Sequence, residues 1–304
     1  MLDLLTIGTV TIDLYYKGDS ITEKDNHFRL AIGGKYFADH FFEGLGGGGA
    51  NVAIGIIKAG LTAGVIAKIG NNPFKQIIID KLDESGVKHK DFCDIEDEYI
   101  NISSIILNKT GEKTVLNYRT PHQHVISCNA DYEKLLKAQA LYMANLSKVS
   151  LTERIDILHF AKKHNVKVFA NLNVTDCRRP IEQIMHFARY VDVMIINGYE
   201  FADIVKLPYE SIDFDLDIVK KYAPFNEGHI LVITDGNKGS YTYHQGKVYR
   251  QKAVSTKKVF DTTGAGDAYT AGFIASYLES SDIQASMKAG AEYAVTIIEK
   301  LGAN

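Results

Sequence analysis

The sequence predicts an α/β protein with a mainly parallel central sheet, helices on both of its faces and a small separate β-sheet. Short apolar runs alternate with amphipathic segments from about Ala138 onward, which is typical of strands joined by right-handed helical crossovers. Glycine-rich stretches at 44–49 and 264–266 each precede a helical segment, as many ligand-binding turns do. The 304 residues contain no internal repeat or disordered linker, so we expect one domain, 1–304.

The composition is that of an ordinary globular protein and argues against several partners. A formal net charge of -3 gives no electrostatic case for binding nucleic acid or an anionic membrane. Cys93, Cys128 and Cys177 are far apart in the sequence, so neither a zinc site nor a disulfide framework is indicated. The N-terminus lacks the features of a signal peptide, and no apolar run approaches membrane-spanning length. We therefore expect a cytoplasmic protein.

The first strand is expected at 4–9, and Asp13 follows it within an apolar, β-branched run. An acid just beyond the C-terminal end of a parallel strand lies where α/β folds bind ligands, although position alone is explained more simply by a turn aspartate. Segments at about 14–43 and 100–120 then form the small second sheet. Strand-like pieces are expected at 28–32 and 36–42, and a hairpin at 103–107 and 113–118. The alternating apolar residues of this hairpin would be buried against either a substrate or a partner. The alternative is a surface hairpin without a function.

The glycine run 44–49 opens a helix that we expect to end at Ala59, before Gly60. Four consecutive glycines suggest a close approach between backbone and ligand. The run also fits the dinucleotide pattern Gly-x-Gly-x-x-Gly, but no acidic residue follows at the distance that this reading requires. A strand at 62–69 and a helix at 76–85 come next.

The second half of the chain is expected to be regular. Further strands are predicted at 139–144, 166–170, 191–196 and 229–234, with helices at 151–164, 181–189, 199–206, near 215–222 and from 281 to 301. Ser150-x-x-Glu153 and Ser281-x-x-Gln284 have the spacing of a capping box, and so does the pair Asn197 and Glu200.

The run Asp261-Thr262-Thr263-Gly264-Ala265-Gly266-Asp267 is expected to connect a strand, from about 247 to 260, to the helix that follows. Unpaired N–H groups and the helix dipole would make this turn an anion site. Asp267 lies in the first helical turn, where a carboxylate can accept a proton from an attacking hydroxyl. The alternative is a glycine-rich turn in which Asp267 only caps the helix.

The full run resembles the C-terminal signature of the ribokinase-like (PfkB) carbohydrate kinase family. Gly46-Gly47-Gly48-Gly49-Ala50-Asn51 is similar to that family's N-terminal signature, Gly-Gly-x-Gly-Ala-Asn, and the likeness extends from Gly8 to about Ala303. It implies a ribokinase-like fold with a β-sheet lid, and transfer of the γ-phosphoryl group of ATP to a hydroxyl of a small sugar or sugar-like compound. No Walker A motif is present, so the chain is not a P-loop kinase.

The resemblance assigns roles to individual residues. Asp267 would be the general base, and the N–H groups of Gly264, Ala265 and Gly266 would stabilise the transferring phosphoryl group. Asp13, Gly47 and Asn51 would bind the sugar. Ribokinases often carry lysine where this chain has Gly48, so ribose specificity is not implied.

The resemblance also places the nucleotide and its ions. Asn197, Thr234, Gly236 and Gly239 would contact ATP, with the adenine near the final helix. Glu200 would hold Mg²⁺ through water, since Mg²⁺ usually keeps several of its waters. Asp261 and Thr263 are candidates to line a K⁺ site, as in potassium-activated relatives.

The acceptor itself stays open: a sugar, a nucleoside, 2-keto-3-deoxygluconate or a phosphorylated sugar all fit the same superfamily. A non-catalytic nucleotide- or sugar-binding protein on this fold is the alternative from another class, although both signatures and Asp267 argue against it. Because the lid of related kinases often pairs two subunits, a homodimer is a further expectation.

Overall fold

The computed structural model describes residues 1–25, 27–97, 99–108, 112–120, 126, 129–146, 149–214, 229–256, 259–300 and 302–304. Its central sheet has eight strands. In spatial order these are β16 (Lys247–Gln251), β15 (Ser240–His244), β14 (Ile230–Thr234), β13 (Val193–Asn197), β12 (Lys167–Ala170), β11 (Ala138–Met143), β1 (Leu2–Ile7) and β6 (Ala63–Ile66). The pairs from β14 to β6 are parallel and the two pairs at the other edge are antiparallel, which confirms the predicted α/β class.

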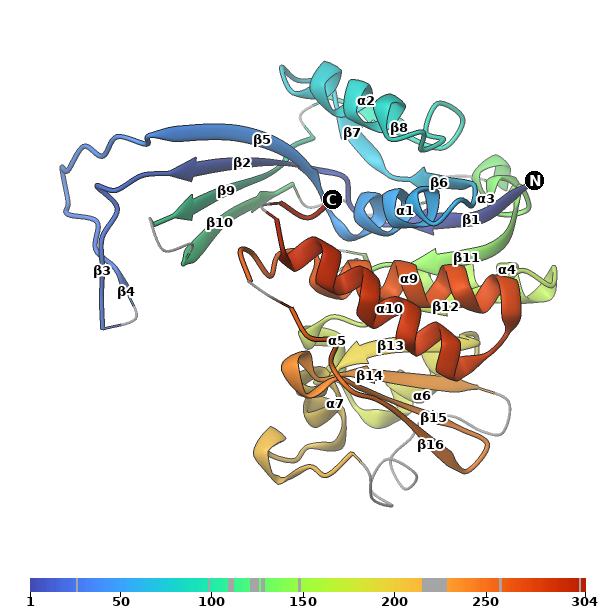
Figure 1. The fold of residues 1–304 in the computed structure, drawn as a ribbon. Helices are drawn as coiled ribbons and strands as arrows, with labels where there is room; N and C mark the ends of the chain where they lie inside the picture. Colours follow the sequence, from blue (N-terminus) through green and yellow to red (C-terminus); the bar gives the residue numbers. More distant parts are fainter. Residues whose placement is uncertain are drawn as a thin grey trace.

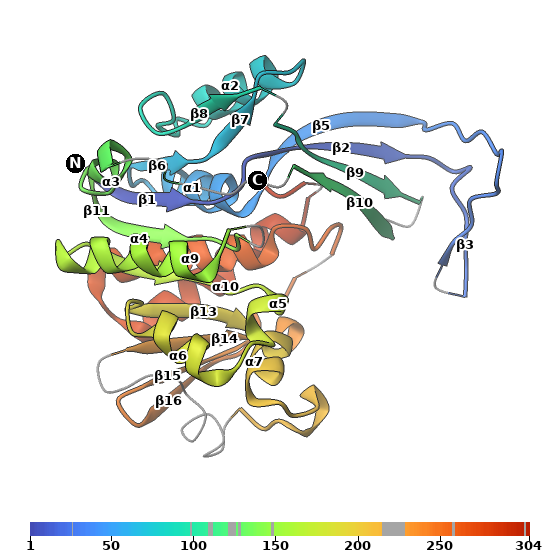
Figure 2. The ribbon, with the colours of Figure 1, turned by 180° about the vertical axis from the view of Figure 1, so that it is seen from behind.

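Helices cover both faces of this sheet. One face carries α1 (Gly48–Lys58), α9 (Ala265–Ser280) and α10 (Ile283–Ile298), as Figure 1 shows. The other carries α4 (Leu151–Lys163), α5 (Val174–Cys177), α6 (Ile181–Ala188) and α7 (Gly198–Val205), seen in Figure 2. Beyond β6 lie α2 (Lys75–Glu84), β7 (Lys68–Gly70) and β8 (Asp94–Glu96), and α3 (Asn129–Leu135) precedes β11. None of the helices in these residues combines the length and apolar character that a membrane crossing requires.

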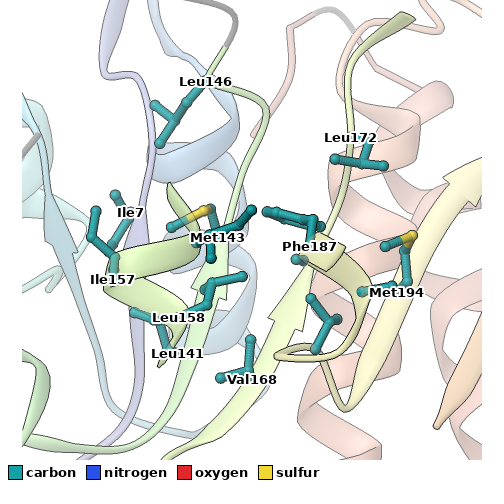
Figure 3. Packing of buried hydrophobic residues seen from close by; sticks show 14 of the residues in the cluster. Ile7, Leu141, Met143, Leu146, Ile157, Leu158, Val168, Leu172, Phe187 and Met194 are labelled. Atoms are coloured by element: carbon teal, nitrogen blue, oxygen red, sulfur yellow. The ribbon is translucent and has the colours of Figure 1, made fainter. Parts of the chain in front are cut away.

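The core forms where apolar side chains of the strands meet these helices. Figure 3 shows the α4–α6 side, where Leu141, Met143 and Val168 of the sheet gather against Ile157 and Leu158 of α4 and Phe187 of α6. All six are fully buried. Local signals position these elements: the Ser150 hydroxyl accepts a hydrogen bond from the Glu153 N–H at 3.1 Å, as the predicted cap requires.

The second sheet is a separate layer that extends from one end of the central sheet (Figure 1). It contains β10 (Lys113–Arg119), β9 (Asn101–Leu107), β2 (Thr11–Lys17) and β5 (His40–Gly46), in that order. We call this four-stranded sheet the lid. Strands β9 and β10 pair as the predicted hairpin, whose tip at 109–111 lies outside the described residues.

Several boundaries differ from the sequence prediction. The lid begins at Thr11, so Asp13 lies within a lid strand and not in a turn after β1. Residues 29–39 form no strand, since the chain turns at Gly33, whose φ is +76°; β3 (Glu23–Lys24) and β4 (His27–Phe28) are only a short ribbon. The predicted helix near 215–222 and Cys128 lie outside the described residues.

Two further predictions are wrong, one for the segment that precedes α9 and one for the first residue of α10. The strand expected up to residue 260 ends at Gln251, because the Phe260 N–H bonds to the Ile298 carbonyl of α10 at 2.8 Å and not to a strand. Ser281 does not cap the last helix, because it adopts a left-handed φ of +55° that closes α9. Asp282 is the cap, and its side chain accepts from the Ala285 N–H at 2.9 Å.

Candidate active site

The C-terminal ends of the parallel strands meet at one edge of the central sheet, and polar residues follow several of them. Thr9 comes after β1, Asn145 after β11 and Asn171 after β12, while Asn197 and Thr234 end β13 and β14. This edge is where open α/β sheets bind ligands. The starts of α1 and α9 lie at the same edge, since Gly48 and Asp267 line one cavity together with Thr9 and Asn145.

The start of α1 requires glycine for two physical reasons. At Gly47 the backbone has a φ of +96°, which L side chains rarely adopt. At Gly49 an added Cβ would lie 2.9 Å from the backbone of Gly8, so the helix packs directly on the turn after β1. The glycine run therefore brings the beginning of α1 close to the strand ends.

The start of α9 has the geometry of an anion site. Gly264 caps the helix with a φ of +77°, and Asp267 lies in the first turn, as predicted. The Ala265 N–H donates to the Thr262 carbonyl at 3.3 Å and so helps to close the turn. Gly264 and Gly266 are therefore the stronger candidates for binding an anion through their N–H groups.

Asn51 and Asp267 form a direct pair across the two helix starts. The Asn51 Nδ2 donates to the Asp267 Oδ2 at 2.7 Å. Burial raises the pKa of Asp267, and the hydrogen bond from Asn51 lowers it without cancelling the rise. A carboxylate with a raised pKa beside an anion site is suited to act as a general base.

A cavity of about 350 Å³ opens between Asp267 and the lid. Its wall combines residues of α1, α9, the lid and the strand ends: Thr9, Gly47, Gly48, Tyr99, Asn101, Arg119, Thr120, Asn145, Leu146, Asn171 and Asp267. Close to it, the side-chain oxygens of Asn51 and Asn171 are buried and accept no hydrogen bond from any described residue. Buried acceptors of this kind need donors, which the hydroxyl groups of a sugar would supply. We call this space the acceptor cavity.

Asp13 is not among the residues that line this cavity. It is 6% exposed, and its Oδ1 accepts from the Thr11 hydroxyl at 3.1 Å. Burial raises its pKa, while the hydroxyls of Ser103 and Thr11 and the charge of Arg119 act against the rise. The Arg119 guanidinium donates to the Ser103 Oγ at 3.2 Å, so Asp13 is linked to the cavity wall through Ser103 and Arg119.

A second cavity, of about 550 Å³, lies on the other side of the start of α9. Thr234, Gly236 and Gly239 line it, as do Ala265 and Gly266. The opposite wall is apolar and comes from α10, through Ala291, Ala294, Val295 and Ile298. We call this space the nucleotide cavity, because a phosphate chain at Gly266 would leave a flat aromatic base beside the apolar wall of α10.

Asn197 and Glu200 form the predicted capping box at the start of α7. The Glu200 N–H donates to the Asn197 Oδ1 at 2.9 Å, and the Asn197 N–H donates to the Glu200 Oε2 at 2.8 Å. Neither residue lines the two cavities described above, although Asn197 pairs in register with Thr234. Burial raises the pKa of Glu200 to about 7, against the hydrogen bonds from Asn197.

Asp261 and Thr263, the candidates for a K⁺ site, lie in direct contact. The Thr263 hydroxyl donates to the Asp261 Oδ1 at 2.6 Å. Both oxygens also accept hydrogen bonds from the ammonium of Lys113, which reaches them from β10 of the lid. This ammonium group therefore lies on the side where a monovalent cation bound to these two oxygens would lie.

Sequence reasoning missed several residues of this site. Lys113 and Arg119 reach it only because the lid folds over the strand ends, which no local pattern reveals. Asn145 and Asn171 carried a usable signal, since each follows a predicted parallel strand by one or two residues.

Comparison with solved structures defines the class of fold. The structure is similar to that of an Arabidopsis thaliana ribokinase complexed with ribose and ATP, with a TM-score of 0.82 and 21% sequence identity. The match covers 99% of this chain and 94% of that one. A nucleoside kinase of Methanocaldococcus jannaschii gives a TM-score of 0.72 at 20% identity, over 100% of this chain and 93% of that one. The fold is therefore ribokinase-like.

The family follows from the sequence as a whole. A family model described as pfkB family carbohydrate kinase matches residues 1–304. The chain belongs to this family and is a carbohydrate kinase. Its relatives include a 5-dehydro-2-deoxygluconokinase of Clostridium tetani, 26% identical over 98% of this chain and 87% of that protein. A probable fructokinase-5 of Arabidopsis thaliana is 26% identical over 78% of this chain and 74% of its own length.

Proposed function

We propose that the protein transfers the γ-phosphoryl group of ATP to a hydroxyl of a sugar-like acceptor, with Asp267 as the general base. One observation carries this proposal: consecutive residues at the start of α9 face different cavities. Gly266 lines the nucleotide cavity and Asp267 lines the acceptor cavity. A phosphoryl group moving from one cavity to the other would pass the N–H groups at this helix start.

The proposed mechanism assigns each residue a single task. Asp267 accepts the proton of the acceptor hydroxyl as its oxygen attacks the γ-phosphorus. The N–H groups at Gly264–Gly266 stabilise the charge on the transferring group. Asn51 holds Asp267 in position and, with Gly47, contacts the acceptor. Asp13 orders the lid side of the cavity through Ser103 and Arg119.

The residues present fit a magnesium ion held mainly by ATP. Within the described residues, no group of three or more His, Cys, Asp or Glu side chains is arranged to hold a metal. The carboxylate of Glu200, partly neutral because of its burial, would gain from a nearby cation, and its second oxygen is not part of the capping box. Glu200 would then hold Mg²⁺ through a water, and the ion would neutralise charge on the phosphates.

We further propose that the acceptor carries an anionic group, as a sugar acid does. Among the described residues that line the acceptor cavity, Arg119 is the only one with a cationic side chain. Its guanidinium is held in place by hydrogen bonds to the carbonyls of Ile102 and Tyr118 and to the side chains of Ser103 and Asn117. The fixed positive charge would attract a carboxylate or phosphate group of the acceptor. Relatives named 5-dehydro-2-deoxygluconokinase, whose name denotes a sugar acid, are consistent with this choice.

The test is ATP turnover with matched acceptors: neutral sugars, sugar acids, sugar phosphates and nucleosides. We expect the highest kcat/KM with a sugar acid. Arg119→Gln should lower that value about 10- to 100-fold, the loss expected for a hydrogen bond to a charged group. Turnover of neutral sugars should fall less, because Arg119 would affect them only through its contact with Ser103 on the lid side of the cavity. Arg29→Gln is the matched control, because Arg29 is an exposed arginine directly after the short ribbon of β3 and β4. Equal loss with neutral and anionic acceptors would contradict the proposed acceptor class.

A further inference from the structure

Lys113 connects the lid to the loop that precedes α9. Its ammonium donates to the Asp261 Oδ1 and to the Thr263 Oγ1, which lie 148 and 150 positions later in the chain. The Lys113 side chain is 24% exposed, whereas the Asp261 side chain is 0% exposed. This is an ion pair between a lid strand and the proposed anion-binding turn, and it is sheltered from solvent on the side of the carboxylate.

Asp261 organises the turn around that ion pair. Its Oδ1 accepts from the Thr263 N–H at 2.8 Å, and its Oδ2 accepts from the Gly302 N–H at 3.3 Å. Burial would raise the pKa of Asp261, but the hydrogen bonds from Lys113 and Thr263 outweigh it and keep the pKa below its usual value. A buried carboxylate without a cationic partner is strongly destabilising. The turn that presents Gly264 therefore needs a positive charge at this position.

A bound monovalent cation would be one source of that charge. Here the ammonium of Lys113 faces both oxygens that would ligate it, and a K⁺ ion beside an ammonium would meet like charge. We propose that Lys113 is a positioning residue that replaces the monovalent cation, so that phosphoryl transfer does not depend on K⁺. Only the expected change in turnover rests on the proposed function; the expected change in melting temperature does not.

The placement of Lys113 has a second consequence. A bound ion would stay with the turn whatever the lid does, but the charge of Lys113 is carried by β10 and arrives at Asp261 only when the lid lies as it does here. The geometry of the anion-binding turn is thereby coupled to the lid that covers the acceptor cavity. Acceptor binding and phosphate binding are linked through one side chain.

The experiment compares the wild type, Lys113→Met and Lys247→Met in KCl and in N-methylglucamine chloride of equal ionic strength, with ATP as an organic-cation salt. Methionine keeps the length of the side chain and removes its charge. Lys247 is the control, because it is an exposed lysine at the far edge of the central sheet. Turnover and melting temperature are both measured.

We expect the wild type and Lys247→Met to have the same kcat in both salts, within about twofold. Lys113→Met should lose about 10- to 100-fold in kcat without K⁺, the effect of removing a hydrogen-bonded charge. KCl should restore part of that loss and raise the melting temperature of this variant by about 2–4 °C, while leaving that of the wild type unchanged.

Two results would overturn the inference. One is a wild type whose kcat or melting temperature rises with K⁺, which would place an ion where we place the ammonium. The other is a Lys113→Met variant that responds to K⁺ no more than Lys247→Met does, in either measurement. The melting temperatures test the site even if the acceptor or the proposed base is wrong, so a failure of the proposed function can be told apart from a failure of this inference.

Discussion

Replacing Asn51 with alanine should slow the reaction in a manner that depends on pH. The Asn51 amide donates to the Asp267 carboxylate at 2.7 Å, and this bond favours the ionised form of the proposed base. Alanine is a good helix former, so α1 should persist. Without the amide, the pKa of Asp267 rises further above its usual value, and a larger share of the enzyme carries a protonated, inactive base at low pH.

The size of the effect follows from the bond that is lost. A hydrogen bond to a charged group contributes about 1.5–3 kcal/mol. Below the pKa of both enzymes, the fraction of ionised Asp267 should therefore fall about 10- to 100-fold. Well above both pKa values, Asp267 is fully ionised in each enzyme. Only the lost contact between Asn51 and the acceptor then lowers kcat/KM in the variant. The ratio of kcat/KM between wild type and variant should thus shrink as the pH rises.

The assay is a pH profile of kcat/KM for the best acceptor, with ATP saturating. Asn171→Ala is the matched control: Asn171 also lines the acceptor cavity, but its side chain makes no bond with Asp267, so its loss should be equal at every pH. If the Asn51→Ala profile ran parallel to that of the wild type, either Asn51 would not tune the base or Asp267 would not be the base.

Other perturbations test separate parts of the site. Asp267→Asn should lower kcat by about 10²–10⁴ with ATP binding retained by calorimetry, since general-base loss has this size; a kcat within a few-fold of wild type would leave Asp267 as a helix cap only. Gly266→Ala should fold as well as wild type, because an added Cβ meets nothing within 4 Å, yet bind ATP more weakly, because the methyl group enters the nucleotide cavity; unchanged ATP affinity would remove Gly266 from the phosphate site. Burial raises the pKa of Glu200 from 4.5 to about 7, so between these pH values folding takes up a proton. The free energy of unfolding of the wild type should therefore fall by at most about 3 kcal/mol as the pH rises through that window. Denaturant titrations should show a smaller loss in Glu200→Gln, and equal slopes would count against the raised pKa. If the lid pairs two subunits, Leu116→Glu, at a position 73% exposed on β10, should halve the sedimenting mass; a wild type that is already monomeric would end that hypothesis.

The parallel body of the fold could be predicted because its signals are local. Buried parallel strands are short apolar runs, and their helices begin at side chains such as Ser150 and Asn197 whose caps the structure shows. The turn at Gly264 could also be predicted from local sequence, because the left-handed φ that requires a glycine there depends on the turn alone. Local signals also misled: Val259 and Phe260 are typical strand residues, yet the Phe260 N–H bonds to the end of α10.

The candidate site could be predicted where a residue belongs to a family motif or follows the end of a parallel strand. The two family signatures predicted Asp267, Asn51 and the glycines at the starts of α1 and α9. Lys113 and Arg119 were not predicted, because each acts across the gap between lid and body, and their neighbours in the sequence carry no trace of Asp261 or Asp267. Asp13 is the intermediate case: its residue type was recognised, but its place on a lid strand depends on where the strand begins.

The position of the start of α9 between two cavities has a consequence for inhibitor chemistry. A single molecule that joined a nucleotide to a sugar acid through a phosphate bridge would cross from one cavity to the other at Gly266 and Asp267. Each half would hold the other at a high effective concentration, so the joined compound should bind far more tightly than either half alone. Its bridge would need to be short, because the two cavities are separated by the backbone of adjacent residues. The acceptor half of such a bisubstrate compound would meet Arg119 and Gly48 in the cavity wall.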